Sequence, residues 1–188
     1  MNEPYSEALQ SGLAAMERQD IGVAEIQLRA AVAMRPESHQ AHYLLGATLA
    51  QAGRAIDAEN SFLACLGVAP DFGIARFQLG LLQIVGSRLD HGCATLRPLT
   101  ILSDGNYLKW FAQGLIELVR GDQSAAVQSL EQGLALNQQI PALNHDVRGI
   151  LSRVQAAVGS STKPAGGAAA AEDSSSSPHF LIAGYRQT

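Results

Sequence analysis

The sequence predicts an all-α solenoid, a row of paired helices that repeats every 34 residues. Glycines recur at this interval, at Gly12, Gly46, Gly80 and Gly114. A small residue follows each glycine twelve positions later and a large apolar residue follows sixteen positions later, which places both at helical spacing. These residues are Ala24, Ala58, Gly92 and Ala126, and Leu28, Phe62, Leu96 and Leu130. Apolar residues make up 47% of the chain and aromatic residues only 5%, which favours close helix packing over a β-sandwich.

Each unit is expected to be two helices joined by a tight turn. In the second unit we expect helices over about 39–51 and 55–67, with the break at 52–54. Gly53 suits the break because glycine adopts the positive φ of a helix C-cap. Pro70 ends the unit, and Asp71 is expected to cap the next helix.

The third unit departs from this pattern. Gly92 replaces the alanine of the other units, and Pro98 falls inside the second helix. Proline in a helix interior removes a backbone hydrogen bond and costs about 3 kcal/mol. We therefore expect this helix to kink or to end early, with residues 103–105 as a loose connection. A tolerated defect is favoured over a functional hinge.

An amphipathic helix over about 141–158 is expected to cap the solenoid, because a solenoid needs a polar outer face at its ends. Its apolar stripe is Leu143, Val147, Ile150, Leu151 and Val154. The organisation is thus a solenoid over 5–158, with units at about 5–38, 39–72, 73–106 and 107–140. Residues 159–178 are rich in alanine, glycine and serine and are expected to be a flexible linker. Residues 179–188 form an apolar C-terminal peptide with Phe180, Leu181, Ile182 and Tyr185.

The repeat resembles the tetratricopeptide repeat, whose 34-residue period and glycine, alanine and proline positions it shares. The second unit carries the pattern best, with Leu45, Gly46, Ala58, Phe62 and Pro70. The fourth carries Trp110, Gly114, Gly121, Ala126 and Leu130. The resemblance covers about residues 5–140 and implies a right-handed superhelix whose concave face is lined by the first helix of each unit.

The resemblance also implies which residues face this groove: positions 2, 5, 6, 9, 12 and 13 of each unit. Of these 24 residues 18 are apolar, and none is lysine, arginine or asparagine, which argues against a clamp for a terminal carboxylate. Some of these positions also suit packing between neighbouring helices. The expected partner-binding residues are Leu13, Tyr43, Leu44, Phe77, Leu81, Ile84, Phe111, Leu115 and Leu118.

The apolar C-terminal peptide raises three alternatives. It can be a ligand for the groove of its own chain or of a neighbouring copy, a short motif for another protein, or an end with chance hydrophobic residues. A linker of twenty such residues spans roughly 25 Å, which is enough to return to the groove.

Charge and motifs exclude several function classes. The net charge of −4 argues against nucleic acid or an anionic membrane as partner, since both need a basic face. No apolar run approaches 18 residues, and the N-terminus lacks the pattern of a signal peptide, so neither a transmembrane helix nor secretion is expected. Cys65 and Cys93 lie in helical patterns and are expected to be free thiols, which indicates the cytoplasm.

No catalytic, cofactor or metal motif is present in the sequence. His39 and His42 are spaced as a metal pair, but no third ligand lies at a matching spacing, so a structural role is expected. We therefore expect a non-enzymatic scaffold that binds an apolar peptide or helix. One alternative is a chaperone for hydrophobic segments, similar to the chaperones of type III secretion. Another is an assembly subunit of a bacterial surface or secretion machine, similar to pilus-biogenesis tetratricopeptide proteins.

Overall fold

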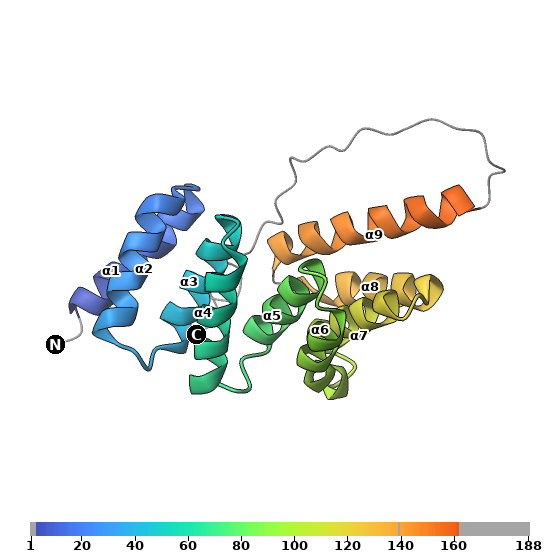
Figure 1. Ribbon diagram of the computed structural model, residues 1–188, viewed down its shortest axis with the longest axis horizontal. Coiled ribbons are helices and arrows are strands. Elements are labelled where there is room, and N and C mark those ends of the chain that lie inside the picture. Colours follow the sequence, from blue (N-terminus) through green and yellow to red (C-terminus); the bar gives the residue numbers. More distant parts are fainter. Residues whose placement is uncertain (1–2, 139, 162–188) are drawn as a thin grey trace.

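The computed structural model describes residues 3–138 and 140–161, and over these residues it contains helices and no strands. The helices are α1 (Glu3–Glu17), α2 (Ile21–Met34), α3 (His39–Gln51), α4 (Ala55–Val68), α5 (Gly73–Val85), α6 (Leu89–Leu96), the 3-10 helix η1 (Arg97–Ile101), α7 (Tyr107–Val119), α8 (Gln123–Leu136) and α9 (Pro141–Ser161). Figure 1 shows the pairs following one another along the long axis of the molecule, with α9 beside α8. The predicted all-α solenoid is confirmed.

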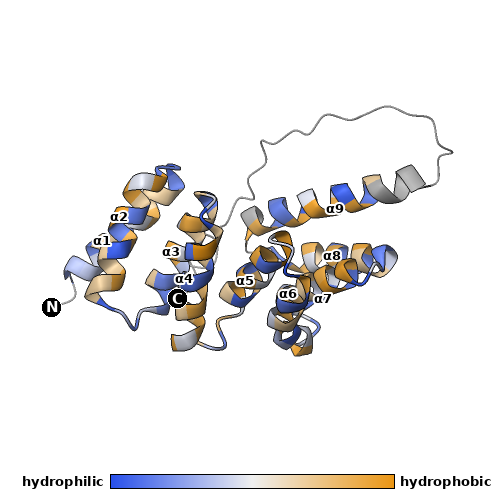
Figure 2. Cartoon of the chain, viewed as in Figure 1, coloured by the Kyte–Doolittle hydropathy of each residue, from blue (hydrophilic) through white to orange (hydrophobic). Residues whose placement is uncertain are grey.

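The two helices of a pair pack closely because the first carries a glycine where the second carries a large side chain. A Cβ atom added at Gly46 would lie 2.8 Å from two ring carbons of Phe62, and one at Gly80 would lie 2.5 Å from Leu96. Gly12 and Gly114 meet Leu28 and Leu130 in the same way. In Figure 2 hydrophobic residues run along all the pairs.

The turn inside each pair contains one residue in the left-handed region. These residues are Gln19, Gly53, Ser87 and Gly121, with φ of 60°, 73°, 61° and 83°. The predicted break at Gly53 is confirmed. The same conformation is adopted by glutamine and serine at the equivalent places, where an L-side chain makes it unfavourable.

Polar side chains cap several helices. Asp20, Ser38 and Asp122 each accept a hydrogen bond from a backbone N–H three residues later, at 3.0–3.2 Å. The expectation for Asp71 was wrong, because α5 begins after Phe72 and no side chain caps it. The Phe72 ring instead packs edge-on against Tyr43, with ring centroids 5.3 Å apart.

The second helix of the third unit ends early, as predicted. α6 stops at Leu96, and the chain continues as η1 with Pro98 in its first turn. A 3-10 helix accepts proline at its start because the missing N–H has no partner there. Leu99 of η1 is buried, so this segment still closes the core.

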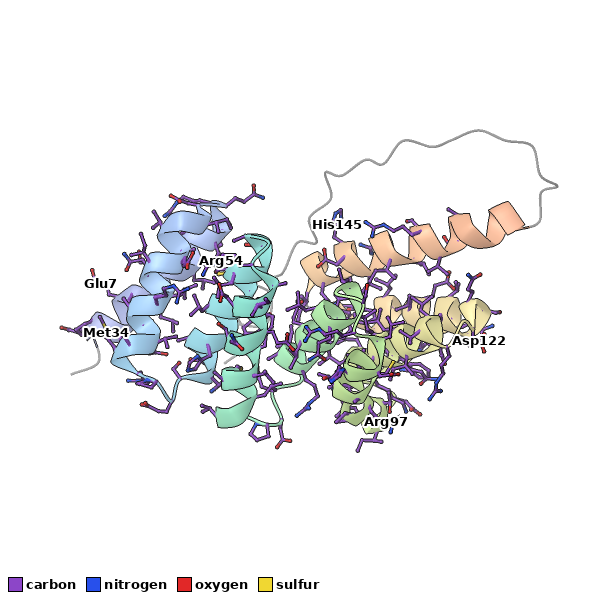
Figure 3. All side chains as sticks on the ribbon, in the orientation of Figure 1. Glu7, Met34, Arg54, Arg97, Asp122 and His145 are labelled. Atoms are coloured by element: carbon purple, nitrogen blue, oxygen red, sulfur yellow. The ribbon has the colours of Figure 1, made fainter. Side chains whose placement is uncertain are left out.

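Two ion pairs join successive units at the same register. Arg54, labelled in Figure 3, donates from Nη1 to Oε1 of Glu25 at 2.7 Å, and Arg88 donates from Nη1 to Oε1 of Glu59 at 2.9 Å. Both pairs are 29 residues apart. The Arg88 guanidinium lowers the pKa of the Glu59 carboxyl, while partial burial opposes this shift.

The last described helix, α9, is joined to the turn before it by paired asparagines. The Asn137 side chain donates to Oδ1 of Asn144 at 2.9 Å, and the Asn144 side chain donates to the carbonyl of Asn137 at 2.8 Å. Leu143 and Val147 of the expected apolar stripe are buried. The helix runs to Ser161, so the remainder of the expected linker and the apolar C-terminal peptide lie outside the described residues. Among the described helices, none has the length and apolar character needed to cross a membrane.

Candidate interaction face

The first helices of the middle units are enclosed, whereas the second helices are half exposed. All residues of α3 from Tyr43 to Ala50 are buried, a run of more than two turns. All residues of α5 from Phe77 to Gln83 are likewise buried. In α4, by contrast, only Ala58, Ser61, Phe62 and Cys65 are buried. The first helices therefore form the inner layer of the solenoid and the second helices its outer layer.

We define the inner stripe as positions 2, 6 and 9 of the units whose first helices are α3, α5 and α7. It contains Gln40, Leu44, Ala47, Ile74, Gln78, Leu81, Leu108, Ala112 and Leu115. Gln40 is half-buried and the other eight are buried. None of the nine carries a charge, so the stripe favours apolar chemistry.

The nine residues expected to bind a partner divide into two groups by burial. Leu13, Ile84 and Leu118 are half-buried and lie at the border of the core. The other six have at most 5% of their surface exposed, and these are Tyr43, Leu44, Phe77, Leu81, Phe111 and Leu115. The structure thus brings all nine to one continuous apolar layer, with the first group partly exposed at its border.

Aromatic contacts explain the burial of the larger side chains. Phe77 and Phe111 are in adjacent units and pack on each other, with ring centroids 5.9 Å apart. Gly133 of α8 makes room for Phe111, since a Cβ atom there would lie 2.4 Å from the ring. Tyr43 contacts the rings of Phe62 and Phe72, and burial raises the pKa of its phenol. These rings hold the units together.

One buried polar residue of the inner stripe, Gln78, was not among the expected binding residues. Gln78 is 1% exposed, and neither Oε1 nor Nε2 of its side chain has a hydrogen-bond partner. The signal available in the sequence was a glutamine within an otherwise apolar stripe of its helix, between Ile74 and Leu81. Spacing alone did not show that its amide would be enclosed.

The outer layer exposes apolar side chains that sequence reasoning did not single out. Ile56 on α4 is 77% exposed and Ile26 on α2 is 66% exposed. These residues are spread over different helices, and scattered exposed apolar side chains are normal on protein surfaces.

The described residues hold no group of three or more histidine, cysteine, aspartate or glutamate side chains that could bind a metal. His42 has a structural contact, with Nε2 2.8 Å from the carbonyl oxygen of Pro36. Cys65 and Cys93 are both free thiols, and burial raises the pKa of the Cys65 thiol to about 12. A thiol with so high a pKa is a poor nucleophile at neutral pH.

The tetratricopeptide repeat family model matches residues 9–63. TTC0263, a thermophilic tetratricopeptide repeat protein of Thermus thermophilus, is 17% identical in a solved structure with a TM-score of 0.69, covering 82% of this chain and 83% of that one. PilF of Pseudomonas aeruginosa is 20% identical with a TM-score of 0.62, covering 84% and 72%. MamA of Desulfovibrio magneticus RS-1, from residue 41 to its end, is 12% identical with a TM-score of 0.62, covering 87% and 99%. No curated protein matches the chain.

These similarities agree with the 34-residue period, with the glycine in the first helix of each pair and with the left-handed residue in each turn. At these identities the solved structures establish the fold, and the family model establishes the repeat in the first two units. The described residues thus have the fold of a tetratricopeptide repeat solenoid, and the family model matches its first two units.

Proposed function

We propose that this chain is a non-enzymatic protein–protein interaction module whose inner face binds an apolar peptide segment. The supporting observation is the inner stripe, which is uncharged over three successive units in a fold that serves protein interaction. A peptide that buries a large apolar side chain against such a surface gains about 1.5–3 kcal/mol per side chain before the cost of ordering. The free thiols favour action in a reducing compartment, the cytoplasm.

We further propose that residues 179–188 occupy this face until a partner displaces them. The segment contains Phe180, Leu181, Ile182 and Tyr185, which match the apolar character of the stripe. Occupation by the chain's own end accounts for how an apolar inner face is kept from water in the absence of a partner.

The test uses the full chain with Phe180→Ser and Ile182→Ser, which removes the apolar anchors of its own segment. A fluorescent peptide of residues 177–188 is titrated into this tail-silenced chain, and anisotropy is recorded. We expect micromolar binding that Leu118→Ser weakens about tenfold, equivalent to ~1.4 kcal/mol. Ile56→Ser, on the outer layer, is the matched control and should leave binding unchanged. The proposal would be contradicted if the peptide did not bind the tail-silenced chain, or if Leu118→Ser and Ile56→Ser weakened its binding equally.

The chaperone alternative from the sequence differs from this function in its behaviour without a ligand. A cargo chaperone for hydrophobic segments should be unstable or dimeric without cargo. The interaction module should be a stable monomer, which light scattering coupled to gel filtration measures directly.

A further inference from the structure

Gln78 differs from Gln83, the other buried polar residue of α5. Five residues further along the same helix, Gln83 is also buried, and its Nε2 donates to Glu59 while its Oε1 accepts from the hydroxyl of Thr95, at 2.9 and 2.7 Å. Gln78 has the same side chain and is also buried, yet neither of its amide atoms is paired. A buried amide without partners disfavours the fold that contains it, and a ligand that pairs with the amide would remove this cost.

The surroundings of Gln78 in the repeat limit what this ligand can be. The equivalent residues of the neighbouring units are Leu44 and Ala112, and the stripe residues of its own helix are Ile74 and Leu81. All four are apolar and buried. The amide therefore lies in an uncharged layer, where an ionised group would lose its hydration without a counter-charge. A neutral ligand with both a hydrogen-bond donor and a hydrogen-bond acceptor could pair with both amide atoms of the Gln78 side chain.

An extended peptide backbone has this pair of groups. A side-chain amide presents one carbonyl acceptor and an NH₂ donor, and one residue of an extended chain presents an N–H and a C=O that complement them. In a bound α-helix these backbone groups are already used within the helix, apart from those at its ends. The unpaired amide thus distinguishes extended segments from helical ones, a choice that the sequence had left open.

We infer that Gln78 recognises the backbone of an extended segment on the inner stripe, and that this segment is residues 179–188 of the chain itself. The inference rests on the proposed function. The length of the chain beyond the described residues permits it: residues 162–178 span up to about 56 Å when extended, whereas α9 is about 32 Å long. In an extended segment Phe180 and Ile182 share one side, so both can face the stripe while the backbone at Leu181 faces the amide.

Gln78→Met tests the role of the amide in the tail-silenced chain, because methionine keeps the length of the side chain and removes its polar atoms. We expect the peptide 177–188 to bind this variant at least tenfold more weakly than it binds the tail-silenced chain. The melting temperature of the variant should equal or exceed that of the tail-silenced chain. Gln128→Met, at an exposed position of α8, is the matched control and should change neither quantity. A second peptide, N-methylated at Leu181, lacks one backbone donor. It should bind the tail-silenced chain more weakly than the unmodified peptide does, with little further loss in the Gln78→Met variant.

The outcomes separate this inference from the proposed function. Unmodified peptide that binds the Gln78→Met variant as tightly as the tail-silenced chain overturns the role of Gln78 and leaves the apolar face as the binding site. If N-methylation weakens peptide binding equally in the tail-silenced chain and in its Gln78→Met variant, the Leu181 N–H donates to a residue other than Gln78. This outcome also overturns the inference. Failure of the peptide to bind the tail-silenced chain at all overturns both proposals.

Discussion

Gly46→Ala tests whether the glycine spacing reflects contact between the helices of a pair. The new Cβ atom would lie 2.8 Å from two ring carbons of Phe62, about 0.6 Å inside the 3.4 Å at which ordinary contact begins. Phe62 is fully buried and its ring packs on Tyr43, so it has little room to move. Overpacking of this kind costs about 1–3 kcal/mol, whereas alanine gains about 1 kcal/mol over glycine in a helix.

The net effect expected is a loss of about 1 kcal/mol, or roughly 2–4 °C in melting temperature for a chain of this size. Gly149→Ala in α9 is the control, because a Cβ atom there meets nothing within 4 Å. That variant should gain up to about 1 kcal/mol from helix propensity alone. Circular dichroism melts of both variants measure the difference. A Gly46→Ala variant as stable as the Gly149→Ala variant would refute the close approach of α3 and α4.

Three further perturbations follow from the structure. Ser87→Gly should raise the melting temperature, because glycine adopts the left-handed conformation without the strain of serine, which stabilises the fold by up to about 1 kcal/mol. Gly53→Ala should lower the melting temperature for the converse reason. A Ser87→Gly variant less stable than the wild type would contradict this interpretation of the turns. The Glu59 carboxyl has a lowered pKa in the fold, so its pairing with Arg88 stabilises the folded chain at neutral pH. This stabilisation is lost as the pH falls through that pKa. The urea midpoint of the wild type should therefore fall more on acidification than that of Arg88→Gln, and parallel curves would count against the pairing. Iodoacetamide at pH 8 should label Cys93 well before Cys65, because Cys65 is buried with a pKa of about 12, and equal rates by mass spectrometry would argue against that burial.

The sequence predicted the features that short-range rules control. The period, the pairing of helices, the break at Gly53 and the early end of α6 before Pro98 depend on helix spacing and on the backbone preferences of glycine and proline. Such preferences act over one or two turns and do not need the rest of the fold. Asp71 shows their limit, because the start of α5 is set by the packing of Phe72 on Tyr43.

The interaction face could be predicted only in part. Register indicates which side of a helix a residue occupies, but not how closely the next helix approaches that side. Phe77 and Phe111 were therefore expected to reach a partner, and in the structure they pack on each other. The unpaired amide of Gln78 likewise depends on what surrounds it in three dimensions, while the left-handed Gln19 and Ser87 are residue types that give little local indication of that conformation.

The left-handed residues in the turns make the chain divisible into interchangeable parts. The same backbone conformation recurs at a constant interval, at Gln19, Gly53, Ser87 and Gly121. A segment from one such residue to the next therefore begins and ends with the same backbone geometry. Duplicating residues 53–86 in place would add one helix pair without altering the direction in which the chain enters the following pair. Inserting a single residue in a turn would instead rotate every later pair relative to the earlier ones. The length of this protein is consequently easier to change than its curvature.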